Sequence, residues 1–362
     1  MKAHTKMTAT LLLATPLLAG LSAIAWATAA MAETQSPKPQ FNTGNDIGYD
    51  VNDPSYFANY APELPAMLAR MPEISADTGL HLSEIEPGLF FVTDGVYQSS
   101  FLVTDEGIVV FDAPPSYAHK LPDLIRKTAP DSQIRYLIYS HNHSDHIGGA
   151  GVFAKIEGLD IIANERTAES LGKSDRTDLP LPTITFSGDH QFEFGGVPIE
   201  IATASFHAED VDTIIYLPDQ KFVMAVDTIT PGEVPFMNFG ATSDVGAYMT
   251  FFDTILEYDF EHLLSGHVSV LGMREDVIIN RDYAFDVRQT AGKMMTTFFD
   301  EFETAFANFE YKNANLGYRA AIESVRRQCA EEIIDRWQDK LSVVDVWADS
   351  HCETVILYNI MH

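Results

Sequence analysis

The chain has 362 residues, which allows one large domain or two smaller ones. Hydrophobic residues make up 46% of it and charged residues 21%, a globular composition that excludes a wholly disordered or fibrous protein. Its 52 acidic and 23 basic residues give a formal net charge of −29. We therefore expect no nucleic-acid partner, because phosphate recognition requires concentrated positive charge.

Residues 1–32 are expected to be a secretion signal. Lys2 and Lys6 precede an apolar stretch rich in Ala and Leu, and Ala30-Met31-Ala32 fits the small-x-small pattern of a cleavage site. A membrane anchor is the alternative, since the stretch approaches the roughly 20 residues that span a bilayer. Cleavage would leave a periplasmic or secreted protein that is not attached to a membrane.

Residues 33–81 are expected to be an N-terminal lead-in with one short helix near 62–71. From about Leu82 onward, short β-rich runs alternate with turns and with stretches of helical period. Helices are expected at 116–128 and around 245–256. Two series of strands, each followed by helices, predict packed sheets with helices outside. The expected strands are 90–92, 100–103, 108–111, 134–139, 184–186, 191–194, 199–202, 213–217 and 221–226.

Residues 281–362 are expected to be a C-terminal helical extension. Apolar residues recur at helical spacing over 287–309 and again over 322–337, which predicts two helices. We expect both helices to pack on the main domain, and a lid over a substrate pocket or a dimer surface is the alternative. A homo-oligomer is therefore allowed.

Two features of this extension stay open at the level of sequence. The tail over 343–360 fits a strand or a helix equally well. Cys329 and Cys352 are the two cysteines of the chain, so they allow at most one internal disulfide and exclude a cysteine-based zinc site.

The most informative segment follows the strand expected at 134–139 and has the sequence His141-Asn142-His143-Ser144-Asp145-His146-Ile147-Gly148-Gly149. Its three imidazoles and one carboxylate are ligands that suit zinc and other divalent ions. Four groups this close could not all reach one ion comfortably, so the segment suggests two ions side by side. The remaining histidines outside this segment that show no ligand pattern are expected to be surface or core residues: His119, His190, His262 and His351.

The segment resembles the His-x-His-x-Asp-His signature of the metallo-β-lactamase superfamily, and the resemblance covers about 82–280. Family members carry further ligands at strand ends downstream, and His207, Asp227 and His267 match these in order. The ligand sets that the resemblance implies are His141, His143 and His207 for one ion, Asp145, His146 and His267 for the other, and Asp227 as the bridge between them.

The same resemblance implies an α/β fold, a four-layer αββα sandwich with the C-terminal helices added to it. It implies two divalent metal ions, Zn²⁺ above all, at one edge of the two sheets. Asp112 resembles an early aspartate that orders the metal loop without binding metal. One departure is Ala204-Ser205-Phe206 before His207, where many relatives have Thr-Pro-Gly. Two acids follow, Glu209 and Asp210, which we expect to be solvated; orienting His207 is the alternative.

The expected activity is that of an exported metal-dependent hydrolase acting on a small-molecule substrate. A metal-bound hydroxide would attack an ester, lactone or related acyl or phosphoryl centre, with Asp145 as the catalytic carboxylate that accepts or passes a proton. The Asp227 bridge favours a lactonase or esterase, whereas the secretion signal favours a β-lactam hydrolase. An iron-dependent sulfur oxygenase of the same fold and a non-catalytic metal-binding protein are further alternatives.

Overall fold

The structure is a computed structural model that describes residues 60–362, all of which belong to one compact unit, Phe57–His362. The expected secretion signal and residues 33–59 of the expected lead-in lie outside the described residues. Within the lead-in, the expected short helix is α1 (Pro65–Leu68). Among the helices of residues 60–362, none combines the length and the apolar character needed to cross a bilayer.

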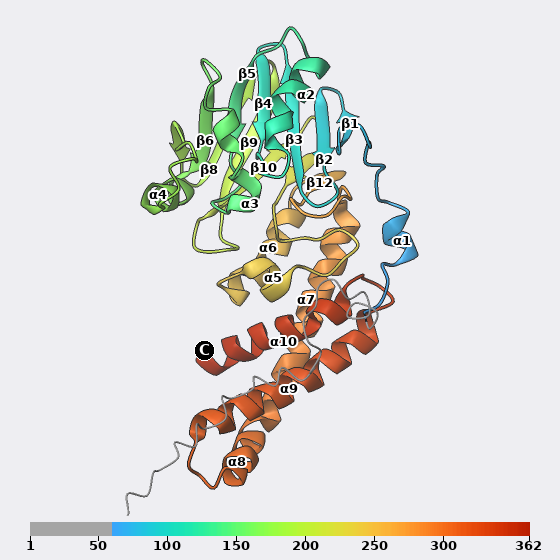
Figure 1. The fold of residues 1–362 in the computed structure, drawn as a ribbon, viewed down its shortest axis with the longest axis vertical. Helices are drawn as coiled ribbons and strands as arrows, with labels where there is room; N and C mark the ends of the chain where they lie inside the picture. The colour runs from blue at the N-terminus through green and yellow to red at the C-terminus, as the bar shows by residue number, and fades with distance from the viewer. Residues whose placement is uncertain (1–59) are drawn as a thin grey trace, which may run out of the picture. The chain divides into compact units, whose positions relative to one another are not determined.

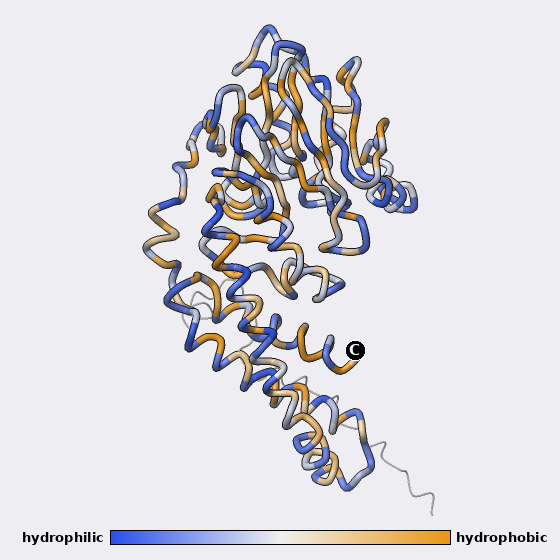
Figure 2. Tube along the Cα trace, turned by 180° about the vertical axis from the view of Figure 1, so that it is seen from behind, coloured by the Kyte–Doolittle hydropathy of each residue, from blue (hydrophilic) through white to orange (hydrophobic). Residues whose placement is uncertain are grey.

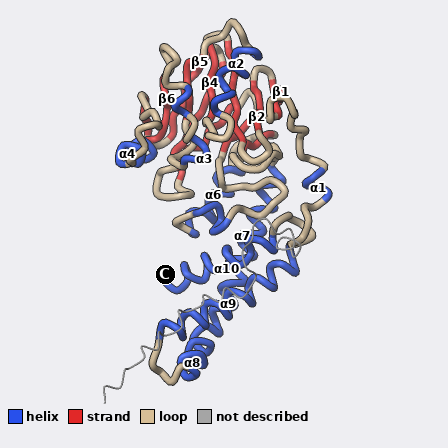
Figure 3. The backbone as a smooth tube through the Cα atoms, in the orientation of Figure 1, coloured by secondary structure: helices blue, strands red, loops and turns tan. Residues whose placement is uncertain are grey.

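Within residues 60–362, twelve strands form two sheets (Figures 1 and 3). The first sheet is antiparallel from β1 to β4 and parallel from β4 to β7, and the second is antiparallel apart from its β11–β12 pair. The first sheet has the order β1 (His81–Glu86), β2 (Leu89–Thr93), β3 (Gln98–Thr104), β4 (Gly107–Phe111), β5 (Ile134–Ile138), β6 (Asp160–Asn164) and β7 (Ile184–Phe186). The second has the order β12 (His262–Leu264), β11 (Phe222–Met224), β10 (Asp212–Leu217), β9 (Val197–Ala204) and β8 (Asp189–Phe194).

In the described part of the chain, the layers pack on one another through three hydrophobic cores. One core lies between the sheets and contains Phe111 of β4 and Phe222 of β11. A second lies on the outer face of the first sheet, beneath α2 (Leu121–Thr128). The third covers the outer face of the second sheet with α6 (Val245–Leu256) and α7 (Arg274–Met294). The expected four-layer αββα sandwich is therefore confirmed.

The C-terminal helices share this third core. Side chains of α9 (Ala314–Trp337) and α10 (Val344–Met361) belong to the same cluster as those of α6 and α7. Figure 2 shows hydrophobic segments in orange at intervals along these helices. The C-terminal helices thus extend the core of the main domain.

The structure differs from the expected C-terminal pattern in two respects and answers two questions that the sequence left open. The apolar stripe over 287–309 is two helices, because the 3-10 turn Met295–Thr297 separates α7 from α8 (Phe298–Asn308). The tail is the helix α10. Helix α7 runs across the domain boundary expected at residue 280. A buried disulfide joins Cys329 of α9 to Cys352 of α10, which answers the pairing question.

Candidate metal centre

The side chains predicted as ligands follow strand ends at one edge of the two sheets. Strands β4 and β5 are parallel, so Asp112 and His141 emerge at the same edge. Strands β9 and β11 are both antiparallel to β10, so His207 and Asp227 emerge in a common direction. Strand β12 is parallel to β11 and delivers His267 beside Asp227. Segments distant in the sequence thus meet because of strand direction.

The histidine-rich loop is held close to the first sheet by backbone contacts. His143 precedes the single-turn helix α3 (Ser144–Ile147), which carries Asp145 and His146. The N–H of Ala113 donates to the carbonyl of His146 at 2.8 Å, and the N–H of Gly149 donates to the carbonyl of Ala113 at 2.9 Å. A Cβ at Gly149 would lie 2.2 Å from another side chain, so only glycine allows this approach.

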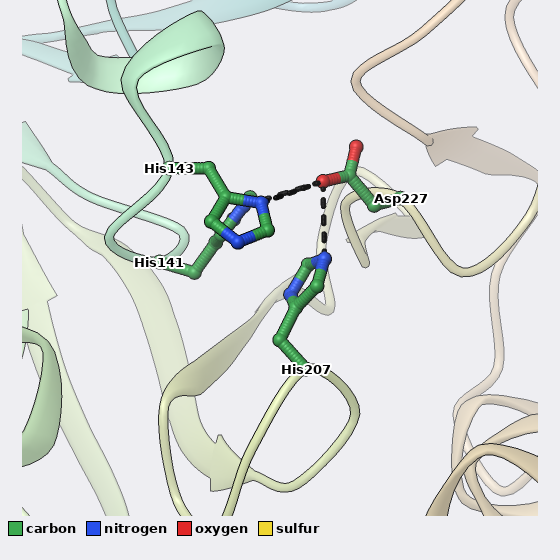
Figure 4. Close-up of side chains that lie close together, drawn as sticks. All are labelled: His141, His143, His207 and Asp227. Atoms are coloured by element: carbon green, nitrogen blue, oxygen red, sulfur yellow. Dashed lines mark ion pairs between the residues drawn. The ribbon is translucent and has the colours of Figure 1, made fainter. Parts of the chain in front are cut away.

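One oxygen of Asp227 faces three histidines (Figure 4). Oδ2 of Asp227 lies 3.2 Å from Nε2 of His141, 3.3 Å from Nε2 of His207 and 3.8 Å from Nδ1 of His143. His141, His207 and Asp227 are buried, whereas His143 is half-buried. These four groups have a spacing that could hold one metal ion.

The other oxygen of Asp227 faces the second set. Oδ1 lies 2.8 Å from Nε2 of His146 and 2.9 Å from Nε2 of His267. Oδ2 of Asp145 lies 3.4 Å and 3.5 Å from the same two nitrogens. Asp145, His146 and His267 also have the spacing of a metal site. The structure therefore brings all seven predicted side chains together, in two sets on either side of Asp227.

The hydrogen bonding of these buried atoms fits a site for cations. Nε2 of His141, Nε2 of His207 and Oδ1 of Asp227 have no hydrogen-bond partner, although each is buried. A buried polar atom without a partner costs free energy, and native proteins leave few of them. Imidazole nitrogens and a carboxylate oxygen pointing at shared positions are the donor set that divalent ions take.

The backbone at two positions of the site is left-handed. Asp227 has φ +69°, a region that aspartate tolerates better than most residues. Gly266 has φ +85°, and a Cβ there would lie 2.8 Å from Cε1 of His146. The turn after β12 thus requires glycine to place His267 beside His146.

Asp212 orients His207, a role that sequence reasoning missed. Its Oδ1 lies 2.6 Å from Nδ1 of His207, and its Oδ2 accepts hydrogen bonds from the N–H groups of Phe206 and His207. This leaves Nε2 of His207 free to face Asp227. Glu209 and Asp210 are exposed, as expected, so neither of them is the orienting residue.

Asp112 holds the start of the histidine-rich loop through a hydrogen bond with Ser140. It is buried, and its Oδ1 accepts a hydrogen bond from the N–H of Ser140 at 2.8 Å. The hydroxyl of Ser140 in turn lies 2.9 Å from Nδ1 of His141. Burial raises the pKa of Asp112 to about 6, even though His146 and Ser140 act in the opposite direction. Asp112 belongs to neither ligand set.

The ionisation of the cluster reflects burial and the two carboxylates. Burial and the neighbouring His207 lower the pKa of His141 to about 3. Burial opposes the charged form of His207 and His267 as well, but the carboxylates beside them outweigh it and raise their pKa values to about 9 and about 10. Burial alone would raise the pKa of Asp227, yet the surrounding histidines hold it well below its usual value.

A cavity of about 420 Å³ opens beside the cluster, a size that suits a small molecule. Ligand residues from both sets line it, namely His143, Asp145, Asp227 and His267. The rest of its wall includes Tyr97, from the loop between β2 and β3, and Trp347 from α10. Helix α10 therefore contributes to the cavity as well as to the core.

The histidines without a ligand pattern lie outside the cluster. His119 and His190 are exposed, and His262 contacts Glu86 at 3.1 Å. His351 is fully buried in the third core. These positions agree with the expectation of surface or core residues.

Comparison with known proteins gives a family for the site-bearing part of the chain. Residues 93–267 match the family model described as the metallo-beta-lactamase superfamily. The chain is 27% identical over 188 residues to 2,4-dinitroanisole O-demethylase subunit alpha of Nocardioides sp. (strain JS1661), covering 51% of this chain and 56% of that protein. It is 34% identical over 99 residues to exodeoxyribonuclease WalJ of Streptococcus pneumoniae, covering 25% of this chain and 35% of that protein. The chain thus spans about half the length, or less, of these curated relatives.

A solved structure shows the same fold over a longer stretch. The inverting sec-alkylsulfatase Pisa1 from Pseudomonas sp. superposes with a TM-score of 0.56 at 17% identity, covering 76% of this chain and 50% of that one. At this identity the likeness concerns the fold.

Proposed function

Because residues 93–267 form a domain of the metallo-β-lactamase superfamily, we propose that this chain is an exported metallohydrolase that cleaves a small-molecule ester, lactone or related acyl or phosphoryl substrate. One observation carries the proposal, namely the two sets of ligand atoms on opposite oxygens of Asp227. A histidine-rich loop that bound one ion would need only one set of ligands, with no carboxylate shared between two sets.

The chain's own residues would hold two divalent cations, Zn²⁺ being the ion that best suits imidazole and carboxylate together. The first set would be His141, His143 and His207, the second Asp145, His146 and His267, with Asp227 shared. Bound there, such ions supply Lewis acidity and lower the pKa of a coordinated water to near neutrality.

Asp145 is suited to handle the proton of the attacking water. Its Oδ2 faces His146 and His267, and a carboxylate has a second oxygen that can accept a proton. Hydrolysis adds the OH of water to the acyl or phosphoryl centre and the proton to the leaving group.

A disulfide between two of the C-terminal helices supports export. The Cys329–Cys352 disulfide is of a kind that persists in oxidising compartments and is rare in the cytosol. Together with the signal-like sequence over 1–32, it supports a periplasmic or secreted protein.

A substrate panel with purified, zinc-loaded protein tests the proposal. The panel contains lactones, thioesters, phosphotriesters, β-lactams and an aryl methyl ether. We expect hydrolysis of at least one acyl or phosphoryl class, loss of it in His143→Ala, and retention of it in the matched control His190→Ala. Turnover that requires iron and oxygen, with oxygen uptake on persulfide, would replace this proposal with the oxygenase alternative. No turnover on any class would leave only a metal-binding protein.

A further inference from the structure

One wall of the cavity beside the cluster combines the segment after Asp227 with helix α10. Glu233 and Phe236 come from the segment between Asp227 and α5 (Met237–Ala241), and Trp347 comes from the first turns of α10. The rings of Phe236 and Trp347 meet edge to face with their centroids 4.9 Å apart. This wall lies outside both ligand sets, so it contacts the part of a substrate that does not react.

Backbone hydrogen bonds fix the position of Glu233. The N–H of Val234 donates to the carbonyl of Ser342 at 3.2 Å, and the N–H of Ser342 donates to the carbonyl of Gly232 at 3.0 Å. Glu233 therefore sits on a short ladder between two segments and not on a free loop. Within residues 60–362, no basic side chain forms an ion pair with its carboxylate.

Apart from its histidines, the charged side chains of the cavity lining are all acidic. Among the described residues, no lysine or arginine lines it, whereas Asp145, Asp227 and Glu233 do. Asp145 and Asp227 face the histidine sets, so their charge is directed toward the cations. Glu233 belongs to neither ligand set and lines the same cavity. Burial and the nearby Glu63 carboxylate raise the pKa of Glu233 to about 7, although His267 acts in the opposite direction, so Glu233 is ionised in mildly alkaline solution.

We propose that this cavity selects substrates whose non-reacting part carries a positive charge, and that Glu233, with the rings of Phe236 and Trp347, is the selecting element. The inference rests on the hydrolase function proposed above. Aromatic faces and a carboxylate together attract organic cations such as quaternary ammonium groups. A carboxylate, sulfate or phosphate on the same part of the substrate would be repelled by Glu233, and the cavity lining has no lysine or arginine to compensate that repulsion. Penicillin-like carboxylates and sulfate monoesters are therefore poor substrates.

Three esters with one leaving group test the selection. They are the p-nitrophenyl esters of propanoic acid substituted at its far end with trimethylammonio, tert-butyl or sulfo groups. The first two groups have the same shape and differ in charge. Rates at about pH 8, where Glu233 is ionised, are divided by the spontaneous hydrolysis rate of each ester. We expect kcat/KM to fall in the order trimethylammonio, tert-butyl, sulfo.

Glu233→Gln should reduce the differences between the esters. The ratio of kcat/KM for the trimethylammonio ester to that for the sulfo ester should fall by about tenfold, the effect of one charge at moderate distance and intermediate dielectric. Glu233→Lys should invert the order. Glu331→Gln removes an equal charge from the exposed face of α9 and should leave the ratio unchanged. Circular dichroism and thermal melting verify that each variant is folded.

A binding measurement provides a readout that does not depend on turnover. Calorimetric titration of the zinc-loaded wild-type protein should show phenyltrimethylammonium binding more tightly than benzenesulfonate, and Glu233→Gln should reduce that difference. If none of the three esters is hydrolysed, the binding measurement decides the selection, and the substrate panel described above decides the hydrolase proposal. If all three are hydrolysed but the sulfo ester is preferred, or Glu233→Gln leaves the ratio unchanged, the selection is wrong while the hydrolase proposal stands.

Discussion

His351 is a buried histidine whose surroundings favour its neutral form. Its Nδ1 lies 2.8 Å from the hydroxyl of Tyr283, its Nε2 lies 3.1 Å from the carbonyl of Phe236, and its ring stacks on Phe239 at 4.4 Å. Burial lowers its pKa to about 4, against the opposing effect of hydrogen bonds to backbone carbonyls. Protonation of His351 should therefore oppose folding.

The sign and size of this effect follow from proton linkage. The unfolded chain has an ordinary histidine pKa of about 6.5, so it binds more protons than the folded chain between about pH 6.5 and about pH 4. The stabilisation is fully present above about pH 6.5 and declines as the pH falls toward the folded value. Between about pH 7.5 and about pH 5, His351 alone should remove about 2 kcal/mol from the free energy of unfolding.

His351→Gln is the matched variant, because an amide can bond to the Tyr283 hydroxyl and the Phe236 carbonyl but does not titrate. Urea unfolding of metal-free protein, followed by circular dichroism at both pH values, gives four free energies of unfolding. Other groups titrate in both proteins, so their contributions cancel in the double difference. Wild-type protein should lose about 2 kcal/mol more than the variant on acidification. Equal losses would refute the neutral, buried state assigned to His351.

Three other variants test the supports of the site and of the extension. Asp212→Asn should weaken zinc binding by about 10- to 100-fold, because His207 loses its charged partner, and chelator competition measures it; unchanged affinity would contradict the orienting role. Replacing Cys329 and Cys352 together by alanine should lower the free energy of unfolding by about 3 kcal/mol, because the disulfide closes a loop and so restricts the unfolded chain. Denaturant titration measures this change, and an unchanged midpoint would contradict the prediction. Gly266→Ala should reduce the melting temperature and metal content together, because its Cβ would collide with the site; normal values for both would contradict the need for glycine.

Much of the site could be predicted because its chemistry is compact in sequence. Four ligand groups lie within six residues at 141–146, and three more follow recognisable strand ends. The orienting role of Asp212 could not be predicted, because Asp212 is the first residue of strand β10 and no sequence pattern there separates it from a strand-capping residue. The proposed selecting role of Glu233 could not be predicted either, because it depends on the cavity wall shared with α10, and no local sequence pattern indicates that wall.

The fold was predictable where apolar runs were long and turns were marked. Strand β12 has three residues, too few to show a period, and β6 was missed although its interior is buried. The helical period over 287–309 continues through Met295–Thr297, so periodicity alone cannot detect the break there. The tail at 343–360 stayed ambiguous because α10 also carries apolar residues outside its buried face, such as the exposed Leu357 and Ile360, and these obscure the helical period.

The central claim is that Asp227 lies between two bound cations. Metal analysis of zinc-equilibrated, gel-filtered protein tests it most directly, with wild-type protein and Asp227→Asn compared under the same conditions. We predict two equivalents of zinc per wild-type chain and a clear loss in the variant. A single equivalent, or a variant that retains the wild-type content, would contradict the paired site and the chemistry derived from it.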